Sequence, residues 1–177
     1  WRVLWDVVNF FSGVTDCGIR MNDKNEVSCR CVCGQTQVSV AKKPMLRFHW
    51  HGPICQNLYQ QPWSVVTVMW AKEATLTQSG HIEYRRPGLL LKRGVCTQCE
   101  QPIFATMTLF PGLKLAFVPG NRYDQQAELP HATAHIFYHR RQSDMKDGLL
   151  KVSGFVKSEL AITWLILKSA FAQMFSR

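Results

Sequence analysis

The chain has 177 residues, of which 46% are hydrophobic, and a formal net charge of +9. This length suits one domain, and the hydrophobic content is too high for a disordered polymer. The charge is compatible with an acidic small molecule, an anionic membrane or nucleic acid, but the sequence has no long Lys/Arg run and no nucleic-acid-binding motif. We therefore do not expect a nucleic-acid partner.

The first predicted element is an apolar helical appendage within residues 1–24. Large apolar side chains recur at helical spacing in the segment Trp1–Val14, and Gly13 is a stop signal. The spaced residues are Trp1, Leu4, Trp5, Val8 and Phe11. Because the chain opens on Trp rather than Met, we expect that it was processed or that further residues precede it.

The second part, residues 25–141, is predicted to be a domain of short strands. Six segments are rich in β-branched and aromatic residues: QVSV, WSVVTVMWA, HIEYR, IFATMTLF, KLAFV and AHIFYH. Turn signals separate them, at Ser79-Gly80, Pro87-Gly88, Pro111-Gly112 and Pro119-Gly120. This pattern predicts an all-β fold of two small packed sheets, with short helical appendages at the N-terminus and the C-terminus.

The last part, residues 142–177, is predicted to be a linker followed by an apolar helix over Ser158–Arg177, with Ser158 as its N-cap. Its apolar residues cover more than one face of a helix, so most of its circumference must be buried. One interpretation is packing on its own domain. The other is docking of Trp1–Val14 and Ser158–Arg177 on a protein partner or a membrane surface. The apolar residues of the helix are Ile162, Trp164, Leu165, Ile166, Leu167, Phe171, Met174 and Phe175.

The seven cysteines indicate a metal site rather than a set of disulfides. Their odd number and short spacings suit a reducing intracellular compartment. Cys31 and Cys33 form one pair and Cys96 and Cys99 another, each at the end of a predicted strand. Two such pairs can supply the four corners of a structural zinc site that ties two sheet edges together. We interpret Cys29 as a bystander, and Cys17 has no evident partner.

The segment FHWHGPIC, residues 48–55, contains a second candidate site. His49 and His51 alternate, so in a strand they share one face, and Cys55 follows a Gly-Pro turn. Together they could form a His-His-Cys zinc site with catalytic potential. The alternative is hydrogen-bonded strand histidines without a metal. We expect no metal role for His131, His135 and His139.

The motifs SCRCVCGQTQVSV, GVCTQCEQPIF and LPHATAHIFYHRR, with the His/Cys segment between the first two, resemble the glutathione-dependent formaldehyde-activating enzyme family, which includes centromere protein V. The resemblance covers roughly residues 27–141. It implies a zinc-binding β-tent fold, with structural zinc on Cys31, Cys33, Cys96 and Cys99. It also implies carbon–sulfur lyase activity on glutathione adducts such as S-hydroxymethylglutathione.

The family's catalytic zinc is bound by a C-x-C-x-x-C motif, and this motif is degenerate here. When Cys55 is placed as its third cysteine, Trp50 and Gly52 stand at the first two positions, and neither side chain can bind a metal. Glu100 and Gln60 also stand where the family usually has glycine.

These features predict a zinc-binding protein derived from glutathione-dependent lyases. The preferred interpretation is that it is catalytically inactive, has one structural zinc and acts as an accessory or assembly subunit of a membrane-associated or multiprotein complex. The alternative is an active zinc-dependent lyase that binds a glutathione adduct and uses Cys55, His51 and His49.

Overall fold

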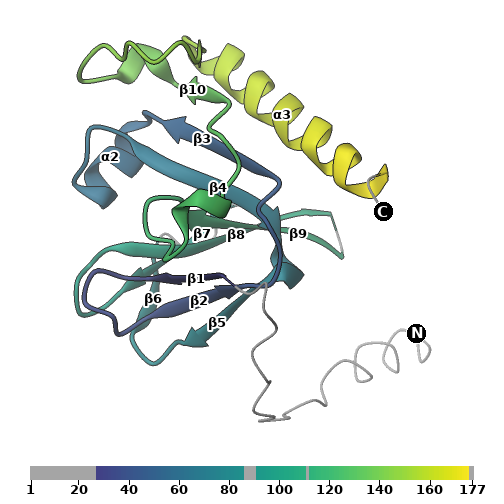
Figure 1. Cartoon of the computed structure of the whole chain (residues 1–177). Helices are drawn as coiled ribbons and strands as arrows, with labels where there is room; N and C mark the ends of the chain where they lie inside the picture. Colours follow the sequence, from purple (N-terminus) through teal and green to yellow (C-terminus); the bar gives the residue numbers. More distant parts are fainter. Residues whose placement is uncertain (1–26, 86–90, 111, 176–177) are drawn as a thin grey trace, which may run out of the picture.

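The computed structural model describes residues 27–85, 91–110 and 112–175. Its strands form two sheets, as the sequence predicts for an all-β fold (Figure 1). The predicted N-terminal helix over Trp1–Val14 and the residue Cys17 lie outside the described residues.

The smaller sheet has three antiparallel strands in the order β1-β2-β5. They are β1 (Val27–Arg30), β2 (Gln37–Val40) and β5 (Ala74–Gln78). The turn between β1 and β2 contains Cys31 and Cys33, which places the first cysteine pair on this sheet.

The larger sheet has the order β11-β10-β3-β4-β9-β8-β7-β6. Its pairs are antiparallel except that β10 is parallel to both β3 and β11. The strands are β3 (Leu46–Trp50), β4 (Ser64–Trp70), β6 (Ile82–Arg85), β7 (Leu91–Cys96), β8 (Pro102–Phe110), β9 (Leu113–Pro119), β10 (Ala134–Ile136) and β11 (Leu150–Lys151). Short helical segments connect some of them: α2 (Pro53–Tyr59), η1 (Ala71–Glu73), η2 (Gln126–Glu128) and η3 (Tyr138–Arg140).

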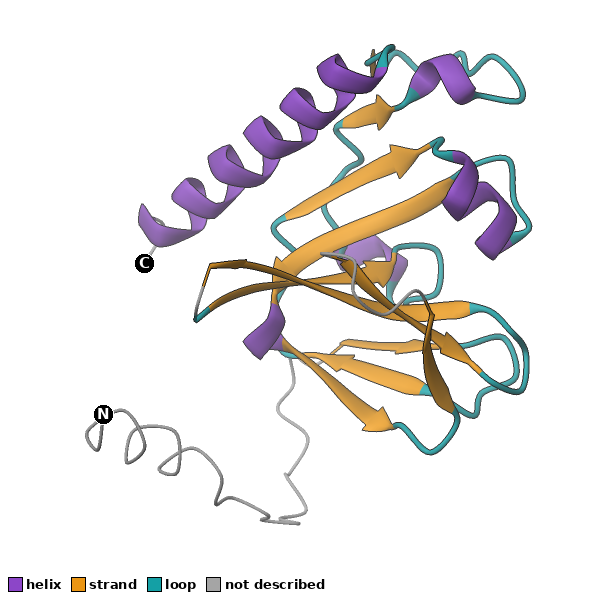
Figure 2. Cartoon of the chain, turned by 180° about the vertical axis from the view of Figure 1, so that it is seen from behind, coloured by secondary structure: helices purple, strands orange, loops and turns teal. Residues whose placement is uncertain are grey.

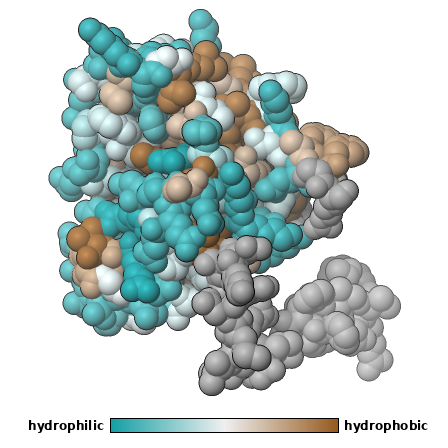
Figure 3. All heavy atoms as spheres, in the orientation of Figure 1, coloured by the Kyte–Doolittle hydropathy of each residue, from teal (hydrophilic) through white to brown (hydrophobic). Residues whose placement is uncertain are grey.

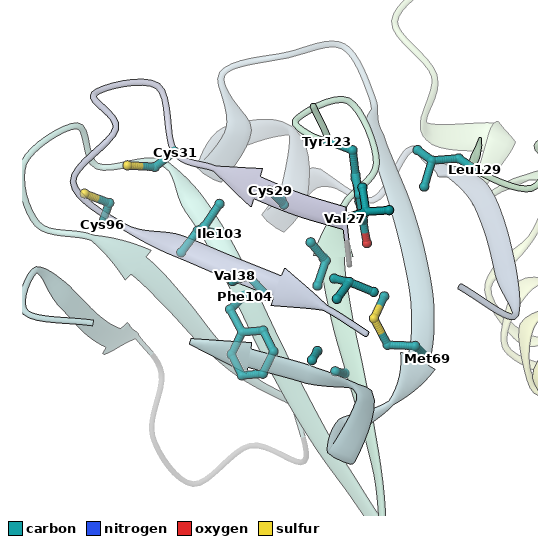
Figure 4. Close-up of a cluster of buried hydrophobic side chains, with 14 residues drawn as sticks. Val27, Cys29, Cys31, Val38, Met69, Cys96, Ile103, Phe104, Tyr123 and Leu129 are labelled. Carbon is teal, nitrogen blue, oxygen red and sulfur yellow. The ribbon is translucent and has the colours of Figure 1, made fainter. Parts of the chain in front are cut away.

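The centre of the larger sheet is buried on both faces because its strands alternate between two cores. On β4, Val68 packs in one core and Met69 in the other; on β9, Leu115 and Ala116 divide in the same way. The first core lies between the two sheets (Figure 4). The second lies between the larger sheet and α3 (Phe155–Phe175), the long helix on the opposite side (Figure 2).

The C-terminal helix differs from its prediction at its start. It begins at Phe155, so Ser158 is inside the helix and the prediction of an N-cap at Ser158 is wrong. Ser158 is fully buried instead, where its Oγ accepts a hydrogen bond from the backbone N–H of Phe137 at 3.1 Å. The hydroxyl of Ser158 therefore does accept a backbone hydrogen bond, but from the segment after β10 and not from the first turn of its own helix.

The helix α3 is apolar on two faces, which have different environments. Ile162, Ile166 and Ala170 are buried against the domain. Large side chains on the other side are exposed, and they form what we call the outer stripe: Val156, Leu160, Trp164, Leu167, Phe171 and Phe175. Within the described part of the chain, no helix is long and apolar enough to span a membrane.

One predicted strand is shorter than expected. The segment AHIFYH is extended only as far as Ile136, and Phe137 then adopts a left-handed conformation with φ 58°. The chain turns there into η3, and the aromatic ring of Phe137 packs 4.7 Å from that of Trp50, measured between ring centroids. The apolar composition of AHIFYH correctly indicated a buried segment, but it did not predict the turn at Phe137.

Candidate functional site

The four predicted structural cysteines come together between the two sheets. Cys31 and Cys33 follow β1, while Cys96 ends β7 and Cys99 lies in the next turn. Their four sulfur atoms all lie within 4.8 Å of one another. Cys31 Sγ is 3.4 Å from Cys33 Sγ, which is 3.6 Å from Cys96 Sγ. Figure 4 shows Cys31 and Cys96 side by side at one end of the core.

These distances fit a tetrahedral zinc ion. Zinc–sulfur bonds of about 2.3 Å place two sulfur ligands roughly 3.8 Å apart. The backbone N–H of Thr36 also donates to Cys31 Sγ at 3.2 Å, and a hydrogen bond of this kind stabilises a thiolate that binds a metal. The residues present therefore fit one structural zinc, and Cys31, Cys33, Cys96 and Cys99 would hold it.

The thiols of this site differ in acidity. Burial opposes ionisation of Cys96, but hydrogen bonds from Thr36 and from nearby backbone outweigh it and lower the pKa of Cys96 to about 6. A backbone hydrogen bond from Gln35 favours ionisation of Cys33, but desolvation and the neighbouring thiols outweigh it and raise the pKa of Cys33 to about 12. All four thiols can be ionised together only if a cation balances the charge of the four thiolates.

Cys29 lies outside this group. It is fully buried, and its Sγ contacts the carbonyl oxygen of Pro119 at 3.7 Å. Burial raises the pKa of its thiol far above the usual value. Cys29 is thus a small core residue.

The residues of the second candidate site are divided between two faces of the larger sheet. Trp50 lines a cavity beneath α3. Cys55 lies in the helix α2, just after β3, and lines the same cavity. His49 and His51 lie on the side of His135 instead, with ring centroids 4.7 and 5.1 Å from it. The structure therefore does not bring Cys55 together with His49 and His51 as a ligand set among the described residues.

The cavity that contains Cys55 has a volume of about 460 Å³. It lies between the larger sheet and α3, and most of its lining is apolar or aromatic. The charged side chains that line it are Arg93 from β7 and Glu159 from α3. A partly open, mostly apolar space with few polar groups is typical of a small-molecule site.

The indole of Trp50 fills the space beside Gly52. A Cβ atom added at Gly52 would lie 2.4 Å from Nε1 of Trp50, closer than real side chains approach. Trp50 is held in place by its contact with Phe137 and by a second ring contact, 6.0 Å between centroids, with Phe48. The two positions are therefore matched: the large side chain at 50 requires glycine at 52.

Cys55 is a neutral thiol at physiological pH. Burial raises its pKa, and the nearby Arg93 and Ser64 offset only part of this effect. A thiol must lose its proton to act as a nucleophile or to bind a metal. Despite the neighbouring Arg93, the raised pKa of Cys55 lowers its reactivity as a nucleophile.

The structure contains a polar cluster that sequence reasoning missed. His51 Nε2 lies 2.9 Å from His135 Nδ1, and His135 Nε2 lies 2.6 Å from Asp147 Oδ2. We expected His135 to have no metal role, yet His49, His135 and Asp147 each place one possible ligand atom within 4.8 Å of the others. The sequence signal was the presence of histidines in HWH and HATAH, but strand pairing is needed to bring them together.

The known-protein comparisons agree with the motifs. A family model described as glutathione-dependent formaldehyde-activating enzyme matches residues 26–140, about two thirds of the chain. No curated protein matches the chain. The match extends from β1 through β10, so it includes both cysteine pairs and the segment FHWHGPIC. The chain belongs to the glutathione-dependent formaldehyde-activating enzyme family.

Proposed function

We propose that this chain is a zinc-stapled member of the family that has lost lyase activity and acts as an accessory or assembly subunit of a multiprotein complex. The observation that carries this proposal is the pair Trp50 and Gly52. Of the three positions of the catalytic motif, only Cys55 retains a thiol, and the indole of Trp50 blocks a side chain at position 52. A zinc ion cannot be held at one thiol whose pKa is raised.

The cavity supports the alternative, an active lyase. It offers space for a small ligand, and the positive charge of Arg93 suits an anionic adduct of glutathione. In this alternative Cys55 would be the reacting group. The two functions differ in whether Cys55 contributes to metal binding and to turnover.

A lyase assay separates the two functions. We expect the purified, zinc-loaded chain to leave the rate of S-hydroxymethylglutathione formation from glutathione and formaldehyde at its uncatalysed value. We also expect the Cys55→Ser variant to bind as much zinc as the original chain. A zinc-dependent rate that disappears in Cys55→Ser would overturn the proposal.

A reconstruction of the motif is the matched positive experiment. The double variant Trp50→Cys/Gly52→Cys removes the indole and supplies two further thiols beside Cys55, so it should bind one more zinc than the original chain. The single variant Gly52→Cys should lose stability without gaining zinc, because Trp50 remains in the way. Equal zinc content in the double variant and the original chain would show that another feature closed the site.

The outer stripe of α3 supports the accessory role. Five of its six side chains are more than half exposed, from 56% at Phe171 to 81% at Phe175. Figure 3 shows hydrophobic residues gathered on the side of the molecule where α3 lies. An exposed row of large apolar residues is typical of a binding surface, because it lowers its free energy when another molecule covers it. We propose a protein partner in a reducing intracellular compartment.

The adjacent charge favours an acidic protein as this partner. Four lysines line an open depression near the end of α3, which Gln173 of the helix also lines. They are Lys42, Lys43, Lys72 and Lys114. An apolar groove with an acidic rim would complement both surfaces.

The docking proposal is tested without removing the helix, whose inner face belongs to the core. We expect the variant Trp164→Ser/Phe171→Ser to fold normally but to elute from cell extract at the size of the free chain, whereas the original chain elutes in a larger complex. The control Lys157→Ser/Lys168→Ser changes exposed polar residues of α3 and should keep the larger size. Self-association of the purified chain, or flotation with anionic vesicles that the stripe variant loses, would contradict a protein partner.

A further inference from the structure

The histidine cluster lies on the face of the larger sheet opposite α3. In the register of β3, β10 and β11, His49 pairs with His135, and His135 pairs with Lys151. Their neighbours Phe48 and Ile136 belong to the core beneath α3, so the alternation of side chains directs His49 and His135 to the other face. Asp147, in the loop before β11, completes the group.

Each member of the group has one polar atom positioned toward the others. The two carboxylate oxygens of Asp147 have different partners. Oδ1 accepts hydrogen bonds from the backbone N–H of Leu149 and from Lys151 Nζ, both at 3.2 Å. Oδ2 remains for the imidazole of His135. The second ring nitrogen of His135, Nδ1, is hydrogen-bonded to Nε2 of His51. Hydrogen bonds from surrounding residues to ligand side chains, such as these, orient the ligands in metal sites.

An unpaired buried atom gives an independent indication of a missing ligand. Nδ1 of His49 has no hydrogen-bond partner among the described residues, although it is inaccessible to solvent. Such an atom costs free energy unless something binds it or its ring. The imidazole of His49 packs edge-on against that of His135, with ring centroids 4.7 Å apart, so an ion bound at one ring would lie close to the other.

We propose that His49, His135 and Asp147 form a second metal site, separate from the four cysteines, that binds one divalent transition-metal ion such as zinc. Two imidazoles and one carboxylate are a set that such ions bind, and the nitrogen ligands disfavour magnesium and calcium. On binding, the metal takes the position of the proton between His135 Nε2 and Asp147 Oδ2, and this proton passes to solvent; His135 then binds the metal as a neutral imidazole that keeps a proton on Nδ1 and donates it to Nε2 of His51.

The required movement is small. Zinc bonds of about 2.0–2.2 Å to nitrogen and oxygen place two ligands roughly 3.3 Å apart. His135 Nε2 and Asp147 Oδ2 are 2.6 Å apart, so the carboxylate must withdraw by about 0.7 Å. Asp147 lies in the loop between η3 and β11, where a side-chain rotation can provide this shift. The charge of Lys151 beside Asp147 weakens the site relative to the four thiolates.

Calorimetric titration with Zn²⁺ tests the site in the full chain whose cysteine site already holds zinc. We expect one additional Zn²⁺ per chain, bound more weakly than the first. Asp147→Asn and His49→Gln should each weaken this second binding at least about 10-fold. The control Asp144→Asn, in the same loop but bonded to Tyr138 and Arg141, should bind as the original chain does.

The spectrum of Co²⁺ identifies which site is filled. Cobalt added in place of the second zinc should give absorption of nitrogen and oxygen ligands, without the sulfur-to-metal band that cobalt gives at the cysteines. Absence of a second binding event, or unchanged binding by Asp147→Asn, would overturn the proposal. Asp147→Asn remains informative if His49→Gln fails to fold. Cys55→Ser should retain the second metal, so this outcome is independent of the proposed loss of lyase activity.

Discussion

Among the described residues, three that are not glycine have φ in the left-handed region, and two of them, Glu100 and Gln60, stand where we expected glycine. Glu100 has φ 54° and Gln60 has φ 51°, both in the left-handed region. The family resemblance leads us to expect glycine at these two positions, and glycine adopts this backbone conformation without a steric cost. Gly34, which follows Cys33 in the first cysteine turn, has φ 76° and keeps the glycine.

The substitution Glu100→Gly should stabilise the zinc-loaded protein by about 1 kcal/mol, because a side chain in the left-handed region costs about 1–2 kcal/mol and the added chain entropy of glycine offsets part of that gain. Glu100 is exposed and its ion pair with Arg85, at 3.8 Å, contributes little. Urea unfolding measures the change. The control Gln98→Gly, in the same turn at negative φ, should be destabilising; stabilisation by both substitutions would refute the argument.

The thiol of Cys55 should react slowly with iodoacetamide in the native chain. Its raised pKa leaves less thiolate at pH 8 than a free cysteine has, and alkylation requires the thiolate. We expect the rate at Cys55, followed by peptide mass spectrometry, to fall below that of the unfolded chain. The rise of the rate with pH should occur at higher pH in the native chain than in the unfolded chain. A native rate equal to the unfolded rate would show that Cys55 is an activated nucleophile.

At the scale of elements, the sequence predicted which segments are strands or helices better than it predicted where some of them begin or end. The strands β2, β4, β8 and β9 match predicted segments to within a residue at each end, because β-branched runs between turn signals specify them locally. The start of α3 and the end of β10 were wrong, because tertiary contacts fix them. The hydroxyl of Ser158 bonds to Phe137 rather than to its own helix, and Phe137 turns away from the sheet to pack on Trp50.

The same distinction explains the two candidate sites. The four cysteines could be predicted because each pair is local and the pairs share one chemistry. The separation of Cys55 from His49 could be predicted only in part: alternation divides the faces of β3, but the short helix α2 decides where Cys55 points. The cluster of His135 with Asp147 needed the parallel pairing of β10 with β3, which no local pattern encodes.

The contact between α3 and the turn after β10 gives a prediction at this scale. Ser158→Ala should destabilise the protein by about 1–3 kcal/mol, because it leaves the buried N–H of Phe137 without its partner. The same hydroxyl contacts the carbonyl oxygen of Val152 at 3.3 Å. The control Ser153→Ala, at an exposed position, should have little effect. Equal unfolding midpoints for Ser158→Ala and the original chain would show that water replaces the hydroxyl.

For the whole molecule, the cysteine site is the link between the two sheets. The smaller sheet contributes Cys31 and Cys33, and the larger sheet contributes Cys96 and Cys99. The three strands of the smaller sheet pack only on the first core, whereas the larger sheet also packs on α3. The zinc is therefore expected to matter most for the smaller sheet, which packs on one core while the larger sheet packs on two.

Removal of zinc should consequently unfold the smaller sheet before the larger one. Binding of a structural zinc contributes about 10–16 kcal/mol in small zinc domains, which is comparable to the whole stability of a domain. After treatment with a strong chelator, hydrogen exchange should accelerate first in β1, β2 and β5, while β3, β4 and β9 keep their protection beneath α3. Cys96→Ser should reproduce this pattern, and the matched control Cys55→Ser should not. Uniform loss of protection in both sheets would mean that the two cores fold as one unit and that the zinc stabilises them together.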